Sequence, residues 1–199
     1  AAIHGVAAGG GLEVALGCHV RLASPGTRVG LPEVTLGIVP GAGGTQRMPR
    51  LIGVRAALEL IVGGRLLPVG RAHALGVIDE VIDSGDLVEV AVARARQMAH
   101  DGASLRRISA IDDRLDEARG NPEMFSAFRK TMAKRARGFD APYACVECIE
   151  ASVTLSYSAG ALKEREVFTR LVASDQSKAQ RHAFFAEREV AKIPDVPKD

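Results

Sequence analysis

Apolar residues recur along the chain at spacings that predict several helices. Between residues 87 and 98 they return every three or four positions, the spacing of an amphipathic helix. Asp86, followed three residues later by Glu89, predicts the N-terminal cap of this helix. Similar patterns predict helices over residues 12–18 and 54–62, from about Thr45, and over most of the chain beyond residue 101, including an apolar stripe of Leu162, Phe168, Leu171 and Val172.

Short runs of β-forming residues predict strands between the first helices. Residues 20–23 and 27–30 are two such runs, and the turn-forming Ser24-Pro25-Gly26 separates them. Residues 77–82 are also strand-like. The first part of the chain therefore mixes short strands with helices, whereas the second part is helical, and the pattern as a whole favours an α/β fold.

Composition limits the classes of function. The chain has 199 residues, of which 47% are hydrophobic and 25% charged, enough for one domain with a full core. The formal net charge is only +2, which leaves no large basic field for a nucleic acid. The apolar stretches are short and interrupted, so we expect no membrane span. A soluble intracellular protein is the expectation.

The cysteines agree with this expectation. Three cysteines are too few for a disulfide framework. Cys145 and Cys148 have the C-x-x-C spacing of redox and zinc sites, but no second pair or nearby histidine completes four ligands. Residues 141–152 instead predict a helix with Pro142 in its first turn, so we expect buried structural cysteines. No histidine lies at metal-ligand spacing from another ligand, and we expect no metal.

The first candidate for chemistry is Gly-Gly-Gly-Leu-Glu at residues 9–13. Glycines let a ligand approach the backbone, and the free N–H groups and positive dipole end of a helix stabilise an anion. Such a turn suits an oxyanion, with the carboxylate of Glu13 in the first helical turn. The alternative is that the glycines only allow close packing and Glu13 only complements the dipole.

Two further segments carry candidate groups. Glu33 follows a β-like run and Pro32, which fixes the direction in which the carboxylate leaves the strand. A solvent-facing loop glutamate is the alternative. Residues 40–45 (Pro-Gly-Ala-Gly-Gly-Thr) begin like a dinucleotide fingerprint, but Gln46 stands where the third glycine belongs, and no phosphate loop is present. We therefore expect a glycine-rich helix entry that holds a water or carbonyl oxygen by its amides.

Residues 5–19 read Gly-Val-Ala-Ala-Gly-Gly-Gly-Leu-Glu-Val-Ala-Leu-Gly-Cys-His, and residues 30–47 read Gly-Leu-Pro-Glu-Val-Thr-Leu-Gly-Ile-Val-Pro-Gly-Ala-Gly-Gly-Thr-Gln-Arg. These two linked motifs resemble the signature of the crotonase family of enoyl-CoA hydratases and isomerases. Helices that lead to His-Ala-Phe-Phe-Ala-Glu-Arg at residues 182–188 and then to a proline-spaced end resemble the close of the hydratase half of bifunctional enoyl-CoA hydratase/3-hydroxyacyl-CoA dehydrogenases.

The resemblance implies a crotonase-like α/β fold, a spiral of ββα units followed by helices. It assigns residues 1–100 to the C-terminal part of the spiral core, residues 101–193 to a helical region that covers the core and active site, and residues 194–199 to a linker towards a dehydrogenase domain. In the family, a loop earlier in the fold supplies a second oxyanion N–H, and the same N-terminal region contacts the CoA. This region, with its strands, has no counterpart in these residues, so we expect a partial spiral.

The resemblance also implies roles for individual residues. In such hydratases two glutamates flank the double bond of a 2-trans-enoyl-CoA, and Glu13 and Glu33 match them. By this analogy Glu13 activates the water that adds at C3, and Glu33 delivers a proton to C2. The backbone N–H of Gly10, shared with Gly11, matches the donor to the enolate oxygen, and the amide of Gly41 helps to hold the water.

Three functions stay open at this stage. The first is hydration of 2-enoyl-CoA in β-oxidation, with no metal or redox cofactor because the substrate carries the CoA. The second is a Δ3-Δ2-enoyl-CoA isomerase, which needs only the Glu33 position. The third is an inactive fragment that binds acyl-CoA. We expect an acyl-CoA partner, a homo-oligomer or linked dehydrogenase domain, and a cytoplasmic location in a bacterium or a peroxisomal one in a eukaryote.

Overall fold

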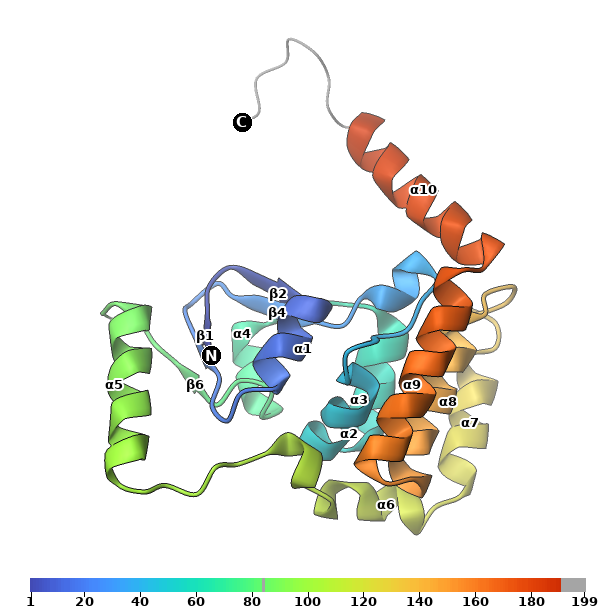
Figure 1. The fold of residues 1–199 in the computed structure, drawn as a ribbon. Helices are drawn as coiled ribbons and strands as arrows, with labels where there is room; N and C mark the ends of the chain where they lie inside the picture. Colours follow the sequence, from blue (N-terminus) through green and yellow to red (C-terminus); the bar gives the residue numbers. More distant parts are fainter. Residues whose placement is uncertain (84, 191–199) are drawn as a thin grey trace.

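The computed structural model describes residues 1–83 and 85–190 (Figure 1). The predicted linker at residues 194–199 lies outside them. Within these ranges the strands are few and short, and helices form most of the chain. No helix of the described part is long and apolar enough to cross a membrane.

The strands form two small sheets. In one, β3 (Leu22–Ala23) lies between β1 (Ala2–Ile3) and β6 (Glu80–Val81), and both pairings are parallel. In the other, β4 (Arg28–Gly30) pairs in parallel with β2 (Val6–Ala8) and antiparallel with β5 (Leu67–Pro68). The predicted strands at residues 20–23 and 27–30 are therefore confirmed. The strand-like residues 77–82 are strand only at β6.

The helices of the first part connect and cover these sheets. They are α1 (Gly10–Leu16), the 3-10 helix η1 (Glu33–Leu36), α2 (Gly44–Ile52), α3 (Val54–Gly63), α4 (Val69–Ala74) and α5 (Leu87–His100). Each predicted helix in this part is present. The Asp86 carboxylate caps α5 by accepting hydrogen bonds from Val88 N (2.8 Å) and Glu89 N (2.9 Å), as the sequence predicts.

The second part is helical, as predicted. Its elements are η2 (Ile108–Ala110), η3 (Asp113–Leu115), α6 (Asp116–Arg119), α7 (Glu123–Met132), α8 (Ala141–Thr154), α9 (Tyr157–Val172) and α10 (Asp175–Val190). Helix α8 packs against α2 and α3, with α7 and α9 against α8 and α9 also against α2, and α10 extends away from the rest (Figure 1). The division into a core of residues 1–100 and a helical region of residues 101–193 stays a prediction.

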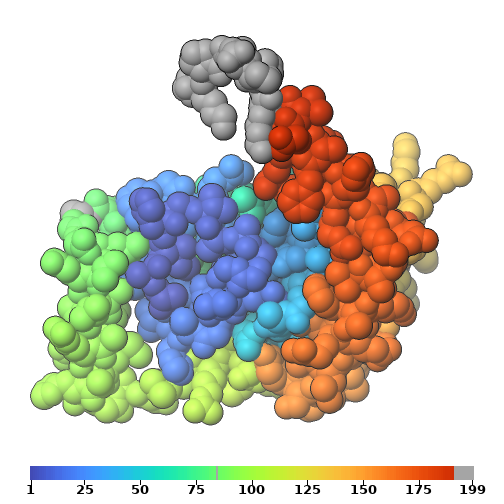
Figure 2. All heavy atoms as spheres, turned by 45° about the horizontal axis from the view of Figure 1, so that its top comes forward, coloured from blue at the N-terminus to red at the C-terminus, as the bar shows by residue number. Residues whose placement is uncertain are grey.

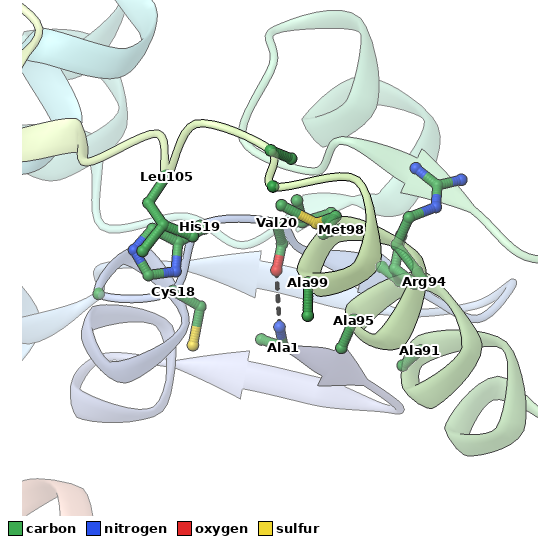
Figure 3. Close-up of a pocket in the computed structure, with 14 residues that line it drawn as sticks. Ala1, Cys18, His19, Val20, Ala91, Arg94, Ala95, Met98, Ala99 and Leu105 are labelled. Carbon is green, nitrogen blue, oxygen red and sulfur yellow. Dashed lines mark hydrogen bonds between the residues drawn. The ribbon is translucent and has the colours of Figure 1, made fainter.

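The apolar stripe of α5 faces a cavity instead of a packed core. No residue of α5 is buried, although its apolar spacing predicts a core-facing helix. A cavity of about 690 Å³ lies between α5 and the edge formed by Ala1 and residues 17–20, lined on the helix side by Ala91, Ala95 and Met98 (Figure 3). On the space-filled surface α5 and the N-terminal residues occupy one side, and α9 and α10 the other (Figure 2).

Candidate active site

Glu13 is held at the N-terminus of α2, although it belongs to α1. Its side chain is buried, and its Oε1 accepts hydrogen bonds from Ala42 N and Gly44 N, each at 2.8 Å. The first N–H groups of a helix have no intrahelical acceptor, and the helix dipole is positive there, so an anion is stabilised. The fold thus places the carboxylate of Glu13 beside the glycine-rich loop of residues 41–45.

Glu33 begins η1, directly after Pro32, and its carboxyl lies against the start of α1. A Cβ built on Gly9 would lie only 3.0 Å from Oε1 of Glu33, so glycine is required for this close approach. Gly9 also adopts φ 57°, a left-handed conformation that glycine tolerates best. Glu13 lies in the first turn of α1, so the two glutamates, which are 20 residues apart in sequence, are both at this end of the helix.

The environment of Glu33 favours its protonated form. The residue is 9% exposed, and its Oε2 is buried with no hydrogen-bond partner among the described residues. Burial raises the pKa of Glu33 to about 7, and the nearby charges of Glu13 and Glu164 act in the same direction. A carboxylic acid with a pKa near neutrality is suited to deliver a proton.

The glycines at the start of α1 leave backbone donors open. Gly10 and Gly11 are exposed, and a Cβ built on either would meet nothing within 4 Å. The N–H groups of a first helical turn lack intrahelical acceptors. These two residues can therefore present donors to a ligand oxygen beside Glu33, as the sequence suggests, although their role stays a prediction.

Gly41 lies at the other side of the loop, where α9 approaches. A Cβ at this position would lie 2.5 Å from Cδ2 of Phe168, so a side chain larger than hydrogen does not fit. This contact explains the glycine by packing alone. The proposed part of its amide in holding water stays a prediction.

Glu164 is a second buried carboxylate at this loop, after Glu13, and was not predicted from the sequence. It is 1% exposed, and its Oε1 accepts from Gly43 N (2.6 Å) while its Oε2 accepts from Thr45 N (2.9 Å) and Thr45 Oγ1. Burial raises the pKa of Glu164 to about 7, whereas the hydrogen bonds from Thr45 and Gly43 oppose this shift.

A sequence signal for Glu164 does exist. The buried residues of α9 are Gly160, Glu164, Val167 and Leu171, which recur at helical spacing and so define its inward face. A glutamate on such a face requires partners in the interior. The predicted apolar stripe of Leu162, Phe168, Leu171 and Val172 was partly wrong, because Leu162 is 71% exposed. A stripe that includes Leu162 does not place Glu164 on the inward face.

The C-x-x-C pair is buried, as expected. Cys145 and Cys148 lie in α8, and both are fully buried free thiols. Burial raises the pKa of Cys148 to about 12 and also raises that of Cys145, so the reactive thiolate is disfavoured at both. Within residues 1–83 and 85–190, no group of three or more His, Cys, Asp or Glu could hold a metal ion.

The site combines two buried carboxyls with helix N–H groups that lack intrahelical acceptors. The enoyl-CoA hydratase/isomerase family model matches residues 1–123. This match covers more than half of the chain, so the protein belongs to the enoyl-CoA hydratase/isomerase family, the crotonase family. The family predicted from the two glycine-rich motifs is confirmed.

Curated relatives are longer than this chain. The peroxisomal bifunctional enzyme of Cavia porcellus is 45% identical over 192 residues, which are 96% of this chain and 26% of that protein. The peroxisomal fatty acid beta-oxidation multifunctional protein AIM1 of Arabidopsis thaliana is 40% identical over 200 residues, 98% of this chain and 27% of that protein. The chain thus spans about a quarter of the length of the curated relatives it matches.

Solved structures share the fold. The carnitinyl-CoA hydratase of Mycobacterium avium has a TM-score of 0.60 and 27% identity over 94% of this chain and 59% of its own. An enoyl-CoA hydratase from Mycobacterium avium subsp. paratuberculosis has a TM-score of 0.59 at 20% identity, over 93% of this chain and 62% of its own. The predicted crotonase-like α/β fold class, with its helical C-terminal region, is confirmed.

Proposed function

We propose that this chain carries the hydratase site of a β-oxidation enzyme, which adds water reversibly to 2-trans-enoyl-CoA and gives 3-hydroxyacyl-CoA. The pairing of Glu13 with Glu33 carries the proposal. The carboxyl of Glu13 accepts hydrogen bonds from two backbone N–H groups, and burial raises the pKa of Glu33 to about 7. Two nearby carboxyls in such different environments divide into a base and an acid.

The proposed reaction uses both carboxyls in one turnover. Glu13 takes a proton from water while the water oxygen bonds to C3, and the electrons of the double bond move towards the thioester carbonyl. The enolate oxygen accepts hydrogen bonds from the N–H groups of Gly10 and Gly11. Glu33 then gives its proton to C2, and exchange with solvent restores both carboxyls. One oxyanion donor of this kind typically contributes about 10²–10³ in rate.

The test is direct. The purified natural protein that contains these residues is incubated with 2-trans-enoyl-CoA of short, medium and long chains. We expect loss of the conjugated enoyl thioester absorbance and a product heavier by one water, without added metal or redox cofactor. If the folded protein hydrates none of these substrates, the proposal is contradicted. Acyl-CoA binding is then the function to test.

The proposed function implies a partner domain and a cellular compartment. Relatives named as bifunctional or multifunctional enzymes support a covalently linked dehydrogenase domain, which would receive the 3-hydroxyacyl-CoA, and a homo-oligomer is the other arrangement. All six lysines lie at or beyond Lys130, and this lysine-poor, arginine-rich composition supports a bacterial cytoplasm. In a eukaryote we would instead expect the protein in the peroxisome, the compartment printed in the names of those relatives.

We expect Gly44→Ala to damage the site. The added Cβ would lie 2.8 Å from Oε1 of Glu13 and 2.7 Å from Cβ of Pro40, so the carboxylate must move. Overpacking of this kind costs about 1–3 kcal/mol of stability, and misplacement of the base lowers turnover by roughly tenfold or more. Urea unfolding and the hydration assay measure both effects.

Gly70→Ala is the matched control for this change. Gly70 also lies in a helix, but a Cβ there meets nothing within 4 Å. We expect this control to keep its activity and its stability. Equal activity of the Gly44→Ala and Gly70→Ala variants would mean that contact between Gly44 and Glu13 does not matter for turnover.

A further inference from the structure

The buried carboxylate of Glu164 has no part in the reaction proposed above. It lies on α9, between Gly160 and Val167 on the inward face of the helix, and is 1% exposed. Burial of an ionised group costs free energy unless hydrogen bonds compensate it. Its position therefore calls for an explanation from what it contacts.

Four successive backbone N–H groups are divided between two carboxylates. Those of Ala42 and Gly44 point to Glu13, each at 2.8 Å. Those of Gly43 and Thr45 point to Glu164, at 2.6 and 2.9 Å. The loop is thus held from one side by α1 and from the other by α9, and its alternate N–H groups face opposite ways.

The loop needs an external restraint to keep this geometry. Three of residues 41–44 are glycines, and Gly43 adopts φ 98°. Glycine has the largest backbone freedom of any residue, so such a segment does not hold a conformation by itself. Because its N–H groups alternate, fixing the Gly43 and Thr45 pair also fixes the direction of the Ala42 and Gly44 pair.

We propose that Glu164 is a positioning residue for the hydration: by holding Gly43 and Thr45 it aims the N–H groups of Ala42 and Gly44 at Glu13. This inference rests on the proposed function. The residue acts through the loop and does not touch the reacting atoms. It gives the C-terminal helical part of the chain a direct influence on the base, at a sequence distance of 119 to 121 residues from the loop.

The contacts behind Thr45 support this role. Nε2 of Gln46 donates to Thr45 Oγ1 (2.9 Å) and to the carbonyl of Cys148 in α8 (2.8 Å). The Thr45 hydroxyl therefore accepts from Gln46 and directs its proton to Glu164. Gly160 makes room for this arrangement, since a Cβ there would lie 2.1 Å from Oε1 of Gln46. Residues of α2, α8 and α9 thus orient the carboxylate of Glu164 towards the loop.

The test compares Glu164→Gln with Glu166→Gln in the intact natural protein. Glutamine keeps the shape of Glu164, but its NH₂ group faces either Gly43 N–H or the two Thr45 donors, so the loop must shift. We expect kcat for 2-trans-enoyl-CoA to fall about 10- to 100-fold, with KM within about threefold of wild type, because substrate contacts are retained. Glu166 lies on the exposed side of the same helix, and its variant should match wild type.

A second pair of variants tests the same contact with less risk to folding. Thr45→Val keeps the backbone N–H and the branched shape but removes the hydroxyl donor, and Thr45→Ser keeps the hydroxyl. We expect Thr45→Val to lower kcat less than Glu164→Gln does, and Thr45→Ser to retain most of it. If Thr45 contributed only to stability, kcat would not be lower for Thr45→Val than for Thr45→Ser.

The outcomes separate this inference from the proposed function. If wild type hydrates enoyl-CoA while Glu164→Gln behaves like Glu166→Gln, or while KM rises and kcat is kept, the positioning role is wrong. If Glu164→Gln does not fold, equal kcat values for Thr45→Val and Thr45→Ser overturn it instead. An inactive wild type refutes the proposed function itself.

Discussion

Glu13→Gln and Glu33→Gln should each lower the hydration of 2-trans-enoyl-CoA by about 10²–10⁴-fold, the usual contribution of a general acid or base. Glutamine at residue 13 cannot take a proton from water, although it keeps an oxygen for Ala42 N and Gly44 N. Glutamine at residue 33 has no proton to deliver to C2. Steady-state kinetics with the purified natural protein measure both losses.

The same two variants separate hydratase from isomerase. An isomerase shuttles one proton and needs only the carboxyl at residue 33, so with 3-enoyl-CoA the Glu13→Gln variant would keep its turnover. A hydratase loses water addition with either change. Glu166→Gln, on the exposed side of α9, serves as the control. Full hydration by the Glu13→Gln variant would remove this residue from the mechanism. Turnover of 3-enoyl-CoA by wild type and by Glu13→Gln, without hydration of 2-trans-enoyl-CoA by either, would favour the isomerase.

Local sequence was sufficient for the parts of the site that depend on one turn of chain. The glycines before Glu13 predict a helix start with a carboxylate in its first turn, and α1 begins there. Pro32 predicts a fixed exit for Glu33, and that residue begins η1. What brought the two residues into one site was the resemblance to a family, because residues 20 apart on separate elements carry no spacing rule.

The remaining parts depend on tertiary contacts that no local pattern contains. Glu164 reaches the loop of residues 41–45 across about 120 positions. Helical spacing groups it with Val167 and Leu171, but only the packing of α9 on α2 shows that this face is inward. The stripe of α5 has the spacing of a core-facing helix, yet it borders a cavity. Periodicity predicts that a helix has an apolar face, but it does not predict what covers that face.

Glu33→Gln should stabilise the fold at pH 8 while it removes activity. The pKa of Glu33 is raised by burial from 4.5 to about 7, so the folded state binds its proton more tightly than the unfolded state does. The stability from this group is fully present below about pH 4.5 and is lost as the pH rises through 7. Replacing the carboxyl with a neutral amide removes that loss.

The expected gain is about 2–3 kcal/mol between pH 5 and pH 8, since each pKa unit corresponds to about 1.4 kcal/mol. It is measured as the change with pH in the unfolding free energy of the variant relative to wild type, from urea titrations of the intact protein. Glu166→Gln should show no such change, because Glu166 is 68% exposed. A variant whose advantage is the same at pH 5 and pH 8 would mean that Glu33 is not held protonated by its burial. A gain in unfolding free energy that occurs only at high pH would instead show that burial of the Glu33 carboxyl costs stability when it is ionised.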